Sequence, residues 1–174
     1  MPSYVVCNHL SAQFLTKPFL PFMSAGIPFY QQDAYVGVPE PESGEGSSTA
    51  RILHAPSSQL MKGTQLVRQA VSDLSQEGFD IDYVELSGVP HQHVLEELRK
   101  CDFIVEQVFS DLPIAGFGTE AAWFGKPAIV GGYAKKYLAD DQISSTHLPP
   151  SLYCCPSQLK ENIKTLIVDP EYRN

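Results

Sequence analysis

The stretch RILHAPSSQLMKGTQLVRQAVSDLSQEGFDIDYVEL, residues 51–86, contains the pattern that decides the fold. Residues 51–55 are a short apolar run that predicts a strand, and residues 81–86 predict a second one. Between them the apolar spacing predicts a helix over residues 62–76, with Gly78 as its stop. The apolar positions of that helix are Leu66, Val67, Ala70, Val71 and Leu74. A strand, a helix and a second strand in this order are typical of a parallel βαβ unit.

The rest of the chain continues this alternation of helices and strands. We expect a helix through residues 94–98, a strand over 103–105, a helix over 118–124, strands over 127–130 and 151–155, and a last helix capped by Ser157. Such repetition gives a parallel sheet with helices on both faces. The predicted fold class is therefore α/β, a doubly wound, Rossmann-like parallel sheet in a single domain.

Composition indicates three zones within one packed domain. Residues 1–38 are apolar and rich in proline and aromatic side chains, with a strand expected over 4–7, and form a strand and linker packed on or leading into the domain. Residues 39–49 contain nothing to bury and predict a flexible loop. Residues 50–174 form the Rossmann-like domain itself. The length of 174 residues, 43% of them hydrophobic, suffices for one core.

Charge and cysteine usage exclude several function classes. The net charge of −8 argues against a nucleic-acid binder, which needs a basic surface to displace phosphate counterions. The four cysteines show no C-x-x-C spacing and are typical of reduced thiols in a cytoplasmic protein. No apolar run approaches the roughly 20 residues of a membrane span, so none is expected.

Ligands of open parallel sheets bind at the carboxyl ends of the strands. The loops at that edge are expected over residues 56–61, 87–91, 107–118 and 131–133. In the first loop the hydroxyls of Ser57 and Ser58 and the ammonium of Lys62 could face an anion at a helix N-terminus. The simpler interpretation is that a serine caps the helix and that Lys62 is solvated.

The segment GFGTEAAWFGKP, residues 116–127, is the second informative stretch. Two glycines before a helix allow a ligand to approach the backbone closely. The two oxygens of Glu120 could bind a ribose diol, although a carboxylate there also suits the positive end of the helix dipole. Both interpretations of Glu120 remain open at this point.

Three motifs follow one another in a recognisable order: Lys62-Gly63, then GVPH at residues 88–91, then GFGTEA at residues 116–121 with GKP at 125–127. They resemble the carboxy-terminal half of GT-B glycosyltransferases, in particular the retaining family 4 group with its "glycosyl transferases group 1" domain. The resemblance covers residues 50–172, and DPEYR at residues 169–173 looks like the closing turn of that family.

The resemblance implies a role for particular residues. Lys62 matches the lysine that holds the donor diphosphate, and Glu120 matches the glutamate that binds the nucleotide ribose. Gly118 and Thr119 would lie beside the phosphates, and Gly88 and His91 near the base. The full set of expected substrate-binding residues is Ser58, Lys62, Gly88, His91, Phe117, Gly118, Thr119 and Glu120. No catalytic residue is assigned.

The expected function is therefore that of a donor domain, which binds a nucleotide-diphosphate sugar for hexosyl transfer to an unknown acceptor. Polysaccharide biosynthesis is the expected setting, and an N-terminal acceptor domain would come from a longer protein, so this chain alone should be inactive. Neither a metal nor a cofactor is expected, since such enzymes work without bound metal and since His91 and His93 diverge.

Two departures from the family favour a different class of function. Leu112 stands where the family has the first glutamate of its E-x7-E motif, and the arginine that normally precedes the Lys-Gly pair is missing. They favour the alternative of a catalytically inactive Rossmann-like binding or scaffolding module.

Overall fold

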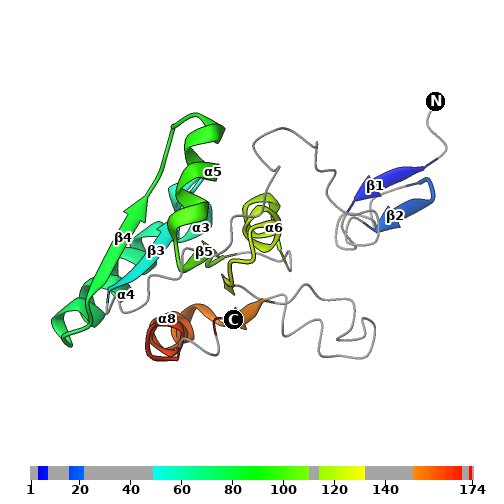
Figure 1. The fold of residues 1–174 in the computed structure, drawn as a ribbon. Coiled ribbons are helices and arrows are strands. Elements are labelled where there is room, and N and C mark those ends of the chain that lie inside the picture. The colour runs from blue at the N-terminus through cyan, green and yellow to red at the C-terminus, as the bar shows by residue number, and fades with distance from the viewer. Residues whose placement is uncertain are drawn as a thin grey trace. The chain divides into compact units, whose positions relative to one another are not determined.

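The computed structural model describes residues 4–7, 16–21, 49–109, 114–131, 151–169 and 173, and divides into two compact units, Met1–Gln32 and Asp33–Asn174 (Figure 1). The first unit contains two parallel strands, β1 (Val5–Cys7) and β2 (Phe19–Pro21). Strand β1 lies where a strand is expected over residues 4–7. Most of the loop predicted over residues 39–49 lies outside the described ranges, since only its last residue, Thr49, is described.

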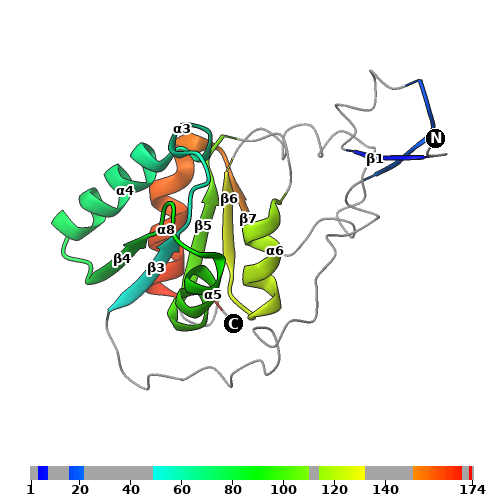
Figure 2. The same cartoon turned by 90° about the horizontal axis from the view of Figure 1, so that it is seen from above.

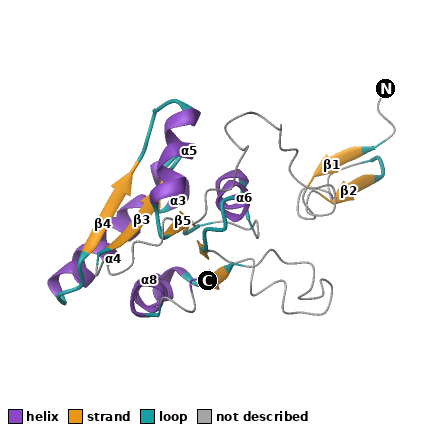
Figure 3. Ribbon diagram, in the orientation of Figure 1, coloured by secondary structure: helices purple, strands orange, loops and turns teal. Residues whose placement is uncertain are grey.

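The second unit is built on one five-stranded parallel sheet (Figures 1 and 3). Its strands are β3 (Ala50–His54), β4 (Ile81–Glu85), β5 (Phe103–Gln107), β6 (Ala128–Gly131) and β7 (Leu152–Cys154). They lie in the order β4-β3-β5-β6-β7, and every neighbouring pair is parallel. The predicted α/β fold with a Rossmann-like parallel sheet is confirmed.

Helices cover both faces of this sheet (Figure 2). On one face lie α4 (Thr64–Gln76) and α8 (Leu159–Val168), which pack their apolar residues on Ile52, Phe103 and Val105. On the other lie α5 (His91–Lys100) and α6 (Gly116–Trp123), which pack against Leu53, Ile104 and Val130. Successive strand residues point to opposite faces, so each strand contributes to both cores.

The helix predicted over residues 62–76 is confirmed as α4 except at its start, which lies two residues later because a separate short helix precedes it. A short helix, α3 (Gln59–Lys62), ends at Gly63, and α4 begins at Thr64. The backbone of Gly63 has a φ of 67°, a left-handed conformation that favours glycine. A Cβ there would also lie 2.5 Å from Cβ of Val108. The helical spacing from Leu66 to Leu74 lies wholly within α4, and the tight turn at Gly63 precedes it, next to the end of β5.

Ser157 is not the helix cap that the sequence predicts. It lies inside a 3-10 turn, Pro156–Gln158, and α8 begins only at Leu159. The turn starts at Cys155, whose backbone N–H donates to Oε1 of Gln158 at 3.3 Å. Proline at the first position of the turn has no N–H to leave unsatisfied, so the turn forms before the helix.

The remaining boundaries differ from the predictions by a few residues. Strand β5 extends two residues beyond the predicted 103–105, to Gln107, and α6 begins at Gly116 rather than at residue 118. Cys154 is buried and Cys155 is exposed, as expected for adjacent residues at a strand end. Within the described ranges, no helix is long and apolar enough to cross a membrane.

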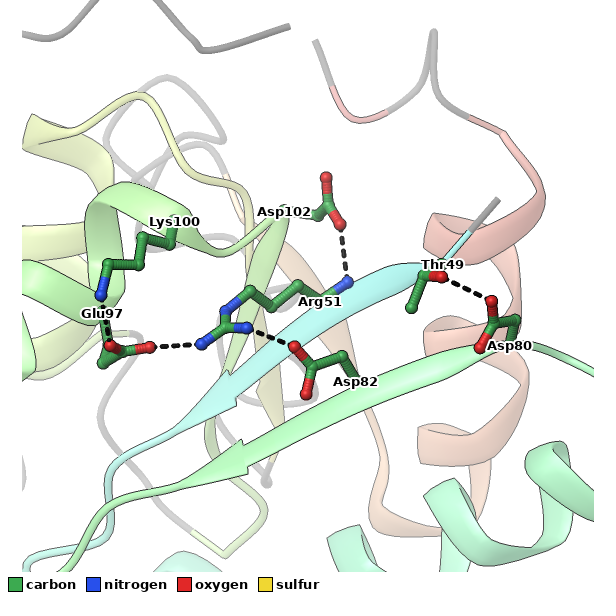
Figure 4. Close-up of polar contacts among 7 residues, drawn as sticks. All are labelled: Thr49, Arg51, Asp80, Asp82, Glu97, Lys100 and Asp102. Carbon is green, nitrogen blue, oxygen red and sulfur yellow. Dashed lines mark hydrogen bonds and ion pairs between the residues drawn. The ribbon is translucent and has the colours of Figure 1, made fainter. Parts of the chain in front are cut away.

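A network of charged groups joins the amino ends of three strands, at the edge that we call the amino edge (Figure 4). The guanidinium of Arg51 on β3 binds Asp82 on β4 and Glu97 on α5, the latter at 2.6 Å. The backbone N–H of Arg51 donates to Asp102 at 2.7 Å, immediately before β5. Glu97 also pairs with Lys100 at 2.8 Å. The network fixes β3, β4, α5 and β5 at the end of the sheet opposite the expected ligand loops.

Candidate functional site

Strand order places a candidate site between β3 and β5, at the edge where the strands end, which we call the carboxyl edge. These strands are neighbours, but the chain leaves β3 toward α3 and α4 on one face and leaves β5 toward α6 on the other (Figure 2). Where connections diverge in this way a crevice is left between two strand ends, and ligands of open α/β sheets bind there.

Lys62 lies at this point. Its Nζ donates to Oε1 of Gln107, the last residue of β5, at 3.2 Å, and its backbone oxygen accepts from Val108 N–H at 3.1 Å. Partial burial lowers the pKa of Lys62, because it removes water from the ammonium, while the negative charge of Glu106 opposes the shift. The ammonium is therefore a fixed, half-buried cation between two loops, not the solvated side chain of the simpler interpretation.

Ser58 acts as a helix cap. Its Oγ accepts a long hydrogen bond of 3.5 Å from Met61 N–H, and α3 follows directly. With only four residues, α3 buries none of its side chains, and Leu60 and Met61 are 83% and 63% exposed. The capping interpretation thus describes Ser58 in this structure.

Glu106 is the residue of the site whose role the sequence does not reveal. Its side chain is completely buried, and its carboxylate accepts hydrogen bonds from Ala115 N–H at 2.9 Å and Gly118 N–H at 3.0 Å. These N–H groups belong to the N-terminus of α6, where a negative charge is stabilised by the helix dipole. The one available signal in the sequence is an acidic residue inside the apolar run FIVEQV before a glycine-rich segment.

The backbone donors expected to face phosphates already have partners. Gly118 N–H is bonded to Glu106, and the N–H and hydroxyl of Thr119 both donate to Ala115 O at 3.1 Å. Phe117 is half-buried and packs on the α5–α6 side of the sheet. An anion at Gly118 N–H would have to displace a buried carboxylate of its own sign.

His91 and Glu120 meet, although 29 residues separate them. Nε2 of His91, the first residue of α5, lies 2.7 Å from Oε1 of Glu120. Glu120 is not in the first turn of α6, because the helix begins at Gly116, so the helix dipole does not explain its presence. Gly88, with a φ of 69°, forms the exposed turn that leads to His91. Among the described residues, no hydrogen bond or ion pair joins Lys62 to this pair.

The buried imidazole of His54 connects β3 to β5 and to the start of α4. It is fully buried at the end of β3, with Nδ1 2.7 Å from Val105 O and Nε2 2.9 Å from Oγ1 of Thr64. The carbonyl can only accept, so Nδ1 carries the proton and Nε2 accepts from the threonine hydroxyl. Because Thr64 begins α4, the imidazole fixes the helix start next to Lys62.

Burial lowers the pKa of His54 below its ordinary value of 6.5, which predicts a stability that depends on pH. The imidazole of His54 binds a proton more readily in the unfolded chain than in the folded one. The stabilisation that comes from keeping His54 neutral should therefore be fully present above pH 6.5. The free energy of unfolding should decline as the pH falls below that value. Urea unfolding between pH 8 and about pH 5 measures the effect. His54→Gln should flatten the slope, and His93→Gln, at an exposed histidine, should not; equal slopes for all three proteins would contradict the role of His54.

Neither metal-ligand geometry nor similarity to known proteins assigns a further role to these residues. The described part of the chain holds no group of three or more histidine, cysteine or acidic side chains suited to a metal ion. Comparison with protein-family models, with curated proteins and with solved structures gave no significant match.

Proposed function

We propose that this chain is the donor-nucleotide-binding half of a metal-independent GT-B glycosyltransferase. The observation that carries the proposal is the position of three motif residues. Lys62, His91 and Glu120 follow β3, β4 and β5, so all three belong to the carboxyl edge of one parallel sheet. This is the edge at which such sheets bind nucleotides.

The chemistry of these side chains suits a nucleoside diphosphate. The half-buried ammonium of Lys62 lies in a less polar environment than water, where its attraction to a diphosphate is stronger. Within the described ranges, the structure gives Oε2 of Glu120 no hydrogen bond. A carboxylate oxygen of this kind can accept hydrogen bonds from the vicinal hydroxyls of a ribose. In sugar transfer, the lysine would stabilise the negative charge that develops on the leaving diphosphate.

The proposed reaction is hexosyl transfer from a nucleotide-diphosphate sugar in polysaccharide biosynthesis, with an acceptor-binding domain outside this chain. A cytoplasmic location is part of the proposal. It is supported by Cys101 and Cys155, which are free thiols. The isolated chain should bind the donor and should not transfer the sugar.

Lys62→Ala is the variant that tests the diphosphate contact. We expect UDP or GDP to bind the wild-type chain, and the variant to bind them about 10-fold to 100-fold more weakly, since a charge-assisted hydrogen bond is lost. Uridine and guanosine should bind equally to both proteins. Isothermal titration calorimetry measures the affinity of both proteins for each of the four ligands. Lys100→Ala, which removes a lysine at the amino edge, is the matched control. An absence of any nucleotide binding at millimolar concentration would contradict the proposal.

One observation favours the second candidate, an inactive binding or scaffolding module. The carboxylate of Glu106 occupies two N–H groups at the start of α6, those of Ala115 and Gly118, which would otherwise be available to a phosphate. The experiment that separates the candidates is sugar transfer by this chain joined to an amino-terminal acceptor domain. Measurable transfer excludes the inactive module, and nucleotide binding without transfer favours it.

A further inference from the structure

The contact between His91 and Glu120 is not explained by the helices to which the two residues belong. His91 opens α5, where the helix dipole disfavours a positive charge, and Glu120 is the fifth residue of α6, beyond the first turn. An exposed polar contact contributes little to stability even when both groups are charged, and the His91 side chain is 56% exposed. The contact therefore has little structural reason to exist.

The contact leaves one carboxylate oxygen for a ligand. Oε1 of Glu120 lies 2.7 Å from Nε2 of His91, and within the described ranges Oε2 accepts no hydrogen bond. The Glu120 side chain is 18% exposed, so part of it is reachable from solvent. A carboxylate bonded through one oxygen keeps a defined plane, and its free lone pairs point in fixed directions.

We propose that His91 is a positioning residue, which orients the Glu120 carboxylate for the ribose hydroxyls of a nucleotide. The inference rests on the proposed function and gives His91 a role different from a contact with the base. Without the imidazole, the Glu120 side chain would be free to change rotamer until a nucleotide binds. The entropy lost on binding would then weaken the affinity about twofold to tenfold. Ligands with both ribose hydroxyls should benefit from the orientation more than ligands with only one.

The test compares ribonucleotides with deoxyribonucleotides. We would titrate UDP, GDP and their 2′-deoxy forms by calorimetry into the whole chain, as wild type, His91→Ala, His91→Gln and Glu120→Gln. His91→Ala should weaken UDP and GDP about twofold to tenfold and should weaken the 2′-deoxy forms, which keep only the 3′-hydroxyl, clearly less. His91→Gln, whose amide can donate to the carboxylate, should restore most of the loss. Glu120→Gln should abolish the preference for ribose.

The control variant is His93→Ala, which removes an exposed histidine from the same helix and should bind every nucleotide as the wild type does. Equal weakening of ribo and 2′-deoxy forms by His91→Ala would overturn the inference, because it would indicate a contact with base or phosphate. Unchanged affinities would overturn it as well. In both cases nucleotide binding by the wild type leaves the proposed function intact, whereas failure of the wild type to bind UDP and GDP removes both.

Discussion

Gly63→Ala should lower the free energy of unfolding by about 2–4 kcal/mol. Two effects add. Alanine is strained at the φ of 67° that Gly63 adopts, and its Cβ would overlap the side chain of Val108 at 2.5 Å. Val108 cannot move freely, because it is fully buried and its N–H is bonded to Lys62 O. Urea unfolding monitored by circular dichroism gives the value.

Gly78→Ala is the matched control for this variant. Gly78 has a φ of 98°, but a Cβ there would meet nothing within 4 Å. It should therefore cost only the backbone strain, about 1 kcal/mol. If both variants lose the same stability, close packing between α3 and β5 does not determine the turn at Gly63.

Glu106→Gln should cost about 2–4 kcal/mol, because charge-assisted hydrogen bonds to two backbone N–H groups are replaced by weaker ones. The amide also turns a donor toward the N-terminus of α6 or leaves one buried N–H without a partner. Urea unfolding gives the loss, and hydrogen exchange at the amides of Ala115 and Gly118 should accelerate more than exchange at the centre of β5.

Glu96→Gln provides the comparison, since Glu96 is an exposed carboxylate on α5 with a 3.4 Å contact to Gln92. It should change the free energy of unfolding by less than about 0.5 kcal/mol. Unchanged exchange at Ala115 and Gly118 in Glu106→Gln would show that the carboxylate does not hold the start of α6.

Local sequence patterns predict the elements of this fold well and their contacts poorly. The apolar runs at β3, β5 and β6 and the helical spacing of α4 are properties of neighbouring residues, so they can be identified without tertiary information. The break at Gly63 depends on Val108, which is distant in the sequence. A periodic apolar pattern contains no information about such a partner.

The candidate site shows the same limit. Resemblance brings Lys62 and Glu120 to attention one at a time, but the partners of both come from other segments: Gln107 for Lys62 and His91 for Glu120. The role of Glu106 is harder still to predict, because a buried carboxylate is favourable only beside hydrogen-bond donors that the folded chain supplies. The sequence identifies side chains with suitable chemistry, and the topology decides which of them meet.

Strand order also sets the sequence of events by which this unit can fold. β3 pairs with β4 within the first βαβ segment, but its other neighbour is β5. The imidazole of His54 and the amide of Arg51 both find their partners 51 residues downstream, at Val105 and Asp102. A nascent chain that ends before β5 leaves these groups unpaired. The segment that defines the fold in sequence therefore completes its hydrogen bonds only with β5, and we expect β3 to become part of a folded core only after β5 has been synthesised.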